Sequence, residues 1–209
     1  MKAVLLFGSA LAITSLASCG GSGDAATSAD STATIMYYNI DPAASKLTWA
    51  GSVVGVKTHT GSLNFTGGSF TTDKGLLTGG EFTVDMKNYM MTDTNYAPDG
   101  SEQGTKANLM GHLMSPDFFA VDSFPTATLR ITAVSGNTAT ADLTVKGKTH
   151  SETITDIVIT PNAMDSTVSA TGKLTFDRQK YGVSWDSGSK DYVLSNDIVL
   201  SVELSGMAR

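Results

Sequence analysis

The chain has 209 residues, with 20 acidic and 14 basic side chains and a formal net charge of −6 at pH 7. This length allows one domain with a sizeable hydrophobic core. The charges are acidic on balance and sparse. This argues against nucleic acid as a partner and against electrostatic docking on anionic lipid, because both need clusters of basic side chains.

Residues 1–18 have the pattern of a secretory signal peptide. Lys2 precedes an apolar stretch that runs to Leu16 and is too short to cross a bilayer as a helix, and small residues precede Cys19. The run L-A-S-C that ends at Cys19, with a glycine after it, resembles the bacterial lipobox, in which the cysteine is acylated, for example with palmitate, and becomes the first residue of the mature chain. We therefore expect Cys19 to be a lipid attachment site. The alternative is an ordinary signal peptide with a chance cysteine near its end.

The segment 19–35 that follows is rich in Gly, Ser, Ala, Thr and Asp, which predicts a flexible tether. With an acylated Cys19, this predicts a protein of the bacterial cell envelope that is anchored to a membrane by its acyl chains. It would face the periplasm or associate with the outer membrane. Cys19 is the only cysteine, so the domain beyond it uses no disulfide, although the envelope permits disulfides.

Residues 36–209 form one predicted domain in which apolar and polar residues alternate. This period of two is typical of strands with one apolar and one polar face, and short glycine-containing turns between them predict antiparallel hairpins. About eight such strands predict an all-β barrel or sandwich. The clearest stretches are 80–87, 127–133, 139–145, 168–176 and 198–204, with weaker ones at 46–49, 62–65 and 153–160.

A transmembrane barrel would show the same alternation. Many of the predicted strands are shorter than the about 9–11 residues that a membrane strand needs, and the aromatic residues do not form girdles at two interfaces. These features favour a barrel that does not itself cross the membrane, held by the predicted lipid anchor.

One interruption breaks the strand pattern. Asn88–Gln103 reads as a long polar loop, and a short helix is predicted at Lys106–Met114, because its larger apolar residues fall on one helical face. Pro116 ends this helix, since the residue before a proline disfavours helical backbone. A helix inserted between strands would cover one mouth of a barrel.

The most specific motif runs from Leu109 to Pro125. It contains a leucine-rich turn, the sequence D-F-F-A-V and a proline before a predicted strand, and it resembles the YceI-like family, whose members carry similar features. The resemblance extends over nearly all of the predicted domain. Four more pieces resemble family motifs in the same order: YNID at 38–41, VKTHTG at 56–61, DLTVKG at 142–147 and DRQKYGV at 177–183.

The resemblance implies a lipocalin-like antiparallel barrel with an elongated apolar cavity, in which characterised relatives bind long isoprenoid or fatty chains. Relatives of this kind lie in the bacterial periplasm. We therefore expect an envelope lipoprotein that carries or sequesters a long-chain lipid or isoprenoid inside the barrel.

The predicted barrel wall mixes small and large inward-facing residues, which would leave an internal channel. The alternative is a fully packed core. The small residues are Gly80, Ala127, Ala133, Ala139, Ala141 and Ala170. We expect nine larger side chains to line the ligand pocket: Trp49, Phe65, Phe82, Phe118, Phe119, Leu129, Leu143, Phe176 and Trp185.

Three polar side chains are candidates for contact with a ligand headgroup: Arg178, His59 and His112. Arg178 stands at the end of an apolar strand, where a barrel rim would place it. Its alternative is a salt bridge to Asp177 or Asp186. The three histidines of the chain are far apart in sequence and not at metal-ligand spacing, so we expect no metal site and no cofactor.

Neither a G-x-S-x-G elbow nor a glycine-rich phosphate loop occurs in the sequence, so we expect a binding protein and not an enzyme. Two alternatives stay open. One is an enzyme that acts on a lipid-like ligand, with His112 or His59 as the base. The other is a structural or stress-related envelope protein with a filled barrel. A homodimer also stays open.

Overall fold

The computed structural model describes residues 34–162, 164–186, 188, 190 and 192–209. All of them belong to one structural unit of the chain. The predicted signal peptide, Cys19 and the tether up to residue 33 lie outside the described residues. No helix in the described part of the chain is long and apolar enough to cross a membrane.

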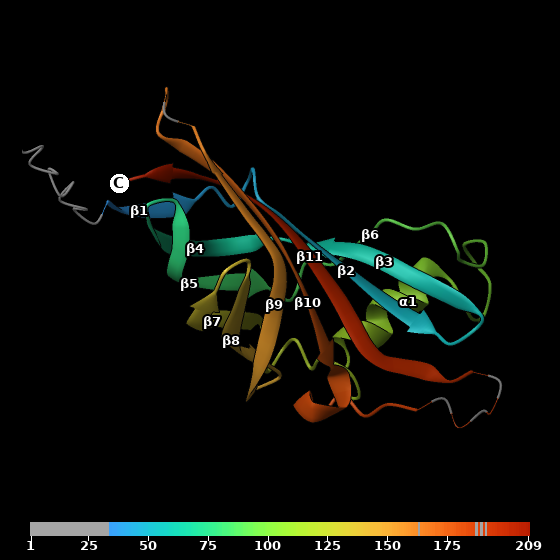
Figure 1. The fold of residues 1–209 in the computed structure, drawn as a ribbon. Helices are drawn as coiled ribbons and strands as arrows, with labels where there is room; N and C mark the ends of the chain where they lie inside the picture. The colour runs from blue at the N-terminus through green and yellow to red at the C-terminus, as the bar shows by residue number, and fades with distance from the viewer. Residues whose placement is uncertain (1–33, 163, 187, 189, 191) are drawn as a thin grey trace, which may run out of the picture. The chain divides into compact units, whose positions relative to one another are not determined.

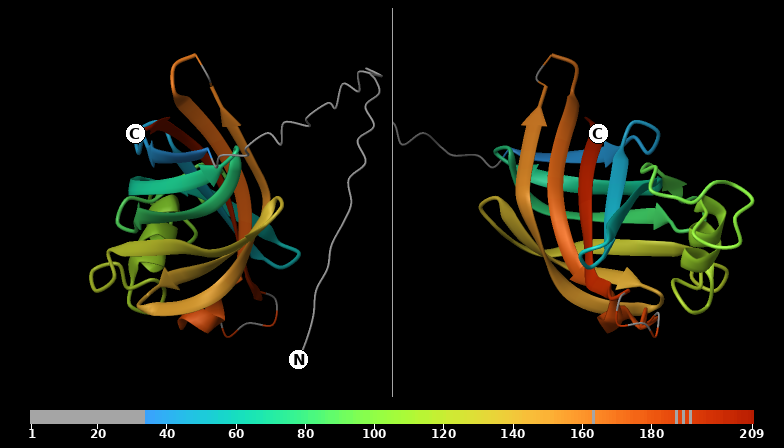
Figure 2. Two further views of the ribbon diagram at one scale, coloured as in Figure 1. Left: turned by 60° about the vertical axis from the view of Figure 1, so that its left-hand side comes forward. Right: turned by 90° about the vertical axis from the view of Figure 1, so that its right-hand side faces the viewer.

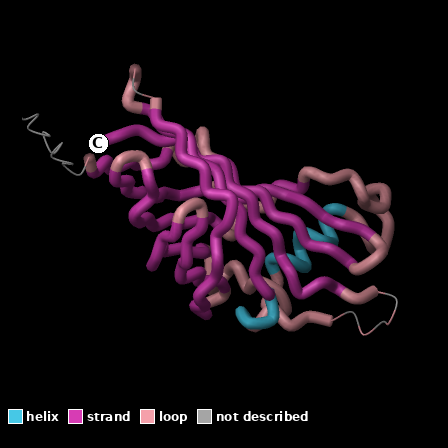
Figure 3. Tube along the Cα trace, viewed as in Figure 1, coloured by secondary structure: helices cyan, strands magenta, loops and turns pink. Residues whose placement is uncertain are grey.

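Antiparallel strands make up most of the fold (Figures 1 and 3), and the strand pairing closes eight of them into a barrel. The order around the barrel is β1–β4–β5–β7–β8–β9–β10–β11, and the pairing of β1 with β11 closes it. The predicted antiparallel barrel of about eight strands is thus confirmed. The strands of the described residues are β1 (Ile35–Ile40), β2 (Lys46–Val53), β3 (Lys57–Leu63), β4 (Phe65–Asp73), β5 (Leu76–Asp85), β6 (Met90–Met91), β7 (Thr126–Ser135), β8 (Thr138–Val145), β9 (Lys148–Pro161), β10 (Thr167–Asp177) and β11 (Leu194–Ala208).

Strands β2, β3 and β6 extend the sheet beyond the ring, and we call them the side sheet. The long strand β11 makes this possible, because residues 206–208 pair with β1 while residues 194–203 pair with β2. A turn at Asp41 separates β1 from β2, where the Ser45 N–H donates to the Asp41 carbonyl at 2.9 Å. The Ser45 hydroxyl then donates to the Ser205 carbonyl at 3.2 Å, which ties this turn to β11.

Strand β10 shows how the alternating pattern specifies the wall. Val168, Leu174 and Phe176 are buried, whereas Ser169 and Thr171 between the inward positions are exposed. Side chains of a strand point alternately to the two faces, so one face of β10 packs inward and the other meets water.

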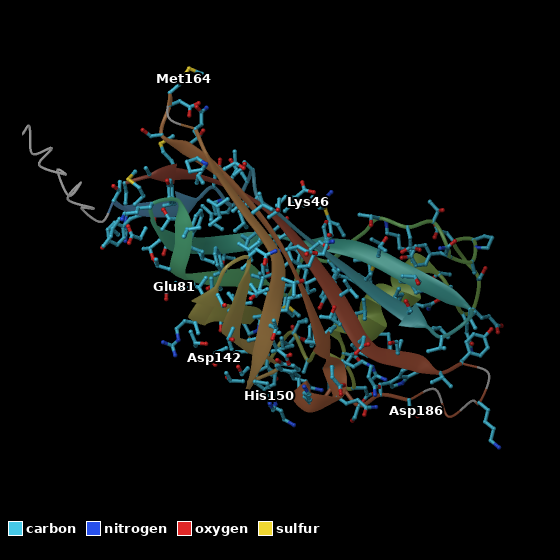
Figure 4. The ribbon with its side chains drawn as sticks, in the orientation of Figure 1. Lys46, Glu81, Asp142, His150, Met164 and Asp186 are labelled. Carbon is cyan, nitrogen blue, oxygen red and sulfur yellow. The ribbon has the colours of Figure 1, made fainter. Side chains whose placement is uncertain are left out.

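The outer face of the barrel carries charge. Arg130 of β7 lies opposite Glu81 of β5 and Asp142 of β8 in the strand register, and its guanidinium is 3.3 Å from the Asp142 carboxylate. Figure 4 labels Glu81 and Asp142 on this part of the wall. Cross-strand pairs of opposite charge add modestly to sheet stability.

The helix α1 (Lys106–Met114) has the predicted bounds and lies at one end of the barrel (Figure 2). A capping box begins it: the Thr105 hydroxyl accepts from the Asn108 N–H, and the Asn108 side chain accepts from the Thr105 N–H, both at 3.1 Å. At its end, the Ser115 hydroxyl donates to the His112 carbonyl at 2.8 Å, just before Pro116. A second, shorter helical segment, the 3₁₀ helix η1 (Arg178–Tyr181), follows β10.

Candidate functional site

A cavity of about 550 Å³ is lined by strands of the ring, by β2 and β3 of the side sheet and by α1. This volume lies within the range of about 300–1,000 Å³ that is typical of small-molecule pockets. Almost all of the surface that faces the cavity is apolar. The structure places all nine larger side chains expected at the pocket around this cavity: Trp49, Phe65, Phe82, Phe118, Phe119, Leu129, Leu143, Phe176 and Trp185. That they contact a ligand stays a prediction.

Fewer of the small residues line the cavity than the sequence suggested. Of the six, Ala127 lines the cavity, on β7 opposite Val84. Ala139 and Ala141 are buried in the wall away from the cavity. Ala133, expected to face inward, is exposed, because a register shift between Ile131 and Ala133 turns the end of β7 over.

One wall of the cavity is a row of aromatic rings supplied by separate segments of the chain. Neighbouring ring centroids are 4.5–6.2 Å apart, within the range of favourable aromatic pairs. The segments are far apart in the sequence, so only the folded barrel brings them together. The row runs Trp49, Tyr89, Phe119, Phe118, His112, Trp185.

The D-F-F-A-V motif is what carries two of these rings into the wall. A turn follows α1, in which the Phe118 N–H donates to the Ser115 carbonyl at 3.0 Å and the Phe119 N–H to the Leu113 carbonyl at 3.1 Å. Ala120 takes the left-handed conformation with φ +50°, which ends the turn. Both phenylalanines are buried as a result.

His59 belongs to a second cluster in the cavity lining, at the side sheet. Its Nδ1 lies 3.2 Å from the Asp93 carboxylate, and its ring stacks on Tyr96 with centroids 4.9 Å apart. The Tyr96 hydroxyl donates to Asp93 at 2.7 Å, and the Thr60 N–H donates to it at 2.9 Å. Asp93 therefore ties the polar loop after β6 to strand β3.

The electrostatics of this cluster follow from those contacts. Burial alone would raise the pKa of Asp93, but the hydrogen bonds from Tyr96, from the Thr60 and Asn95 N–H groups and from His59 outweigh it and lower this pKa to about 2. The pKa of Tyr96 is raised, by burial and by the neighbouring Asp93 charge. Asp93 is thus an ionised acceptor at neutral pH and Tyr96 a neutral donor.

Arg178 does not have the position expected from the sequence. It is buried and lies outside the cavity lining, and its guanidinium donates to the backbone carbonyls of Val183 at 2.6 Å, Trp185 at 3.1 Å and Ser195 at 3.0 Å. Burial lowers its pKa, and the charges of Asp177 and Asp186 oppose that effect. This geometry replaces both the headgroup contact and the salt bridge considered above, because the donors are already occupied by the chain itself.

His112 lies in the aromatic row and lines the cavity, whereas His150 bonds to the Lys180 carbonyl at 3.0 Å and is not a lining residue. Burial lowers the pKa of His112, and Asp117 opposes this. Among the residues that the structure describes, no group of three potential ligands lies close enough to hold a metal ion.

Tyr89 and Tyr96 were missed at the level of sequence, although both line the cavity. They lie in the stretch read as a polar loop. The signal that could have found Tyr89 is its spacing of two residues from Met91, which is buried like it and lies in β6.

Comparison with known proteins agrees with the motifs. The model of the YceI-like domain matches residues 38–205. The chain belongs to this family. Among curated relatives, a UPF0312 protein of Staphylococcus aureus (strain bovine RF122 / ET3-1) is 37% identical over 82 residues, which cover 36% of this chain and 46% of the relative. The chain therefore matches less than half of that relative's length.

Two solved structures share the fold of this YceI-like chain. BcnA of Burkholderia cenocepacia superposes with a TM-score of 0.60 at 19% identity, over 79% of this chain and 98% of BcnA. A polyisoprenoid-binding domain from Saccharophagus degradans superposes with a TM-score of 0.51 at 13% identity, over 82% of this chain and 98% of that domain. At these identities the likeness concerns the fold.

Proposed function

We propose that this YceI-like protein binds a long-chain apolar molecule of the isoprenoid or fatty type inside its barrel, for carriage or sequestration. The observation that carries the proposal is the cavity of about 550 Å³ with its almost wholly apolar wall. Solved relatives of the same fold include a domain named as polyisoprenoid-binding, which supports the isoprenoid class. The role is one of binding and not of catalysis, since the lining offers packing surface and few reactive groups.

The energetics are adequate for such a role. Burying about 10 methylene groups supplies on the order of 8 kcal/mol, before the costs of ordering and association are subtracted. Apolar contact discriminates only weakly between chains that differ by one methylene group. The barrel would therefore accept a range of chain lengths.

Native mass spectrometry of gently purified protein tests the proposal. We expect an adduct with the mass of a lipid, or, after the protein has been stripped of lipid, binding of the neutral fluorophore N-phenyl-1-naphthylamine and its displacement by hexadecanol. Leu76→Ser is the control, because Leu76 is exposed at 68% and lies outside the cavity. Dye bound inside the barrel should bind this variant as it binds the wild type, whereas dye bound to the outer surface at Leu76 should bind it less. A barrel that carries no lipid and takes up none would contradict the proposal.

We further propose that the protein is an envelope lipoprotein anchored through Cys19. The L-A-S-C run after the apolar segment supports this, as does the polar composition of residues 20–34. In the native host, Cys19→Ser should abolish incorporation of a palmitate analogue and move the protein from the membrane fraction to the soluble fraction. Palmitate labelling that survives the substitution would contradict the anchor.

A further inference from the structure

Three side chains of the cavity wall carry a buried polar atom without a hydrogen-bond partner: Trp49 Nε1, Tyr89 Oη and His112 Nε2. In the described part of the chain one other buried side-chain atom shares this state, Thr72 Oγ1, and Thr72 does not line the cavity. Folded proteins satisfy most buried polar groups, because each unmade hydrogen bond is costly. Three of these four atoms belong to residues that line one apolar cavity, so the polar group of a ligand in that cavity is a candidate partner for them.

The chemistry of these atoms defines that partner. The indole N–H of Trp49 can only donate. Burial raises the pKa of Tyr89, so its phenol keeps its proton, and burial lowers the pKa of His112 against the opposing charge of Asp117, so its imidazole is neutral at neutral pH. These three groups are thus uncharged: the indole N–H donates, the phenol O–H can donate, and the imidazole Nε2 donates in the tautomer that carries its proton there. Together they suit an uncharged acceptor.

Trp49 and Tyr89 form the centre of this arrangement. Their rings meet edge to face with centroids 6.1 Å apart, and His112 follows along the same row of rings. Gly61, paired with Trp49 across β2 and β3, lets the indole lie against the strand: a Cβ at Gly61 would be 2.6 Å from the ring. The position of the indole donor is therefore set by the backbone.

Cations lie elsewhere in the lining. The Lys173 ammonium is 3.1 Å from the Asp156 carboxylate. Lys57 stands at the start of β3, four residues from Gly61, which is about 13 Å along a strand. A carboxylate or phosphate placed beside Trp49 and Tyr89 would be desolvated without a counter-charge, which is strongly unfavourable.

We propose that Trp49 and Tyr89, with His112 beyond them, form a polar subsite that hydrogen-bonds the uncharged carbonyl-type end group of a long-chain lipid and selects against lipids with an anionic end group. The subsite rests on the proposed lipid-binding function and adds to it the chemical class of the end group. The apolar remainder of the ligand extends through the rest of the cavity.

Three probes of equal chain length test the subsite: hexadecane, hexadecan-2-one and hexadecanoate, each displacing N-phenyl-1-naphthylamine from lipid-free protein at neutral pH. We expect the ketone to bind about tenfold more tightly than the hydrocarbon, because it satisfies donors that are otherwise unpaired. Hexadecanoate should bind no better than the hydrocarbon. This comparison needs no substitution and so does not depend on the folding of a variant.

Tyr89→Phe removes one donor without changing the ring, and Trp49→Phe removes the other. Each should reduce the preference for the ketone over hexadecane to about threefold or less. Thr72→Val is the matched control, since it removes the unpartnered buried hydroxyl that lies away from the cavity. It should keep the full preference. Circular dichroism confirms that each variant is folded.

The outcomes separate this subsite from the proposed function. If all three probes bind alike, or if the ketone preference survives in both Tyr89→Phe and Trp49→Phe, lipid binding stands and the subsite is wrong. If hexadecanoate binds most tightly, the end group is anionic and the subsite is also wrong. If no probe enters the wild-type barrel, the proposed function fails and the subsite falls with it.

Discussion

At the scale of single residues, Arg178 of η1 ties the stretch that directly follows η1 to the start of β11. Its guanidinium bonds to carbonyls of Val183 and Trp185 just after η1 and of Ser195 at the start of β11. Trp185 is part of the aromatic row that lines the cavity. Arg178 thus holds one wall of the cavity in place without contacting its interior.

Replacing Arg178 should therefore lower the free energy of unfolding much more than replacing a surface arginine. We expect Arg178→Met to lower the free energy of unfolding by about 3 kcal/mol, because it leaves several carbonyls without a donor. Arg130→Met is the control: Arg130 is exposed and pairs with Asp142 on the outer wall, so its loss should cost no more than about 1 kcal/mol. Urea denaturation followed by tryptophan fluorescence measures both, and equal costs would contradict the role of Arg178.

Asp93 makes stability depend on acidic pH. Its pKa is about 2 in the folded protein and 3.8 ordinarily. Between these two pH values the unfolded state therefore binds more protons than the folded state, and the free energy of unfolding falls as the pH falls. The stabilisation is fully present above pH 4 and is lost as the pH falls toward 2. Melting temperatures from pH 5 to pH 2 should show Asp93→Asn below wild type at pH 5 and the two converging near pH 2.

Asp122→Asn is the control for this pH dependence. Asp122 is a fully exposed carboxylate 3.9 Å from Lys87, so its loss should shift the melting temperature little at any pH. A difference in melting temperature between wild type and Asp93→Asn that stays constant down to pH 2 would show that the ionised form of Asp93 contributes nothing to stability.

At the scale of elements, the side sheet depends on close approach at Gly61. A Cβ there would lie 2.5 Å from the Met90 carbonyl of β6 and 2.6 Å from the Trp49 ring of β2. Both contacts are too short, so β6 and the indole would have to move away from β3. Gly61→Ala should lower the free energy of unfolding by about 1–3 kcal/mol through overpacking. Gly67→Ala, where no atom lies within 4 Å, should change stability by less than about 1 kcal/mol. Chemical denaturation of the pair checks this, and similar losses would contradict it.

The elements that sequence could predict are those whose signal is local. Apolar and polar residues alternate along the sequences of β8 and β10, so both strands could be predicted. The helix α1 was predicted with its true bounds, because its apolar face and Pro116 both indicate it. The two-residue strand β6 was not predicted, since two residues show no period. Its pairing with β3 is a property of the folded sheet.

The site divides in the same way. The positions of the nine large side chains around the cavity could be predicted from the alternation and from the family motif, because a large inward-facing side chain of a barrel must lie in its interior. The contacts of His59 with Asp93 and of Arg178 with three carbonyls did not, since each joins segments through backbone turns that have no sequence period. Register shifts have the same effect, and one of them exposes Ala133.

At the scale of the whole molecule, the barrel is hollow in one part and packed in another. Tyr38 and Phe70 stack with centroids 5.0 Å apart and are buried, yet they do not line the cavity. An eight-stranded barrel has just enough interior for side chains to fill, so a cavity persists only where the inward residues are small or where the wall spreads. Here both occur, at Ala127 and at the side sheet.

This division predicts opposite results for one substitution at two alanines. Ala127→Leu adds volume where the cavity is open, so it should preserve the melting temperature and shorten the longest alcohol that the barrel binds. Ala141→Leu adds the same volume at a fully buried position away from the cavity, so overpacking should lower the free energy of unfolding by about 1–3 kcal/mol. Thermal melts together with displacement of N-phenyl-1-naphthylamine by alcohols of increasing length measure both effects. If Ala127→Leu destabilises the protein as much as Ala141→Leu and leaves the chain-length limit unchanged, the space beside Ala127 is not where the ligand lies.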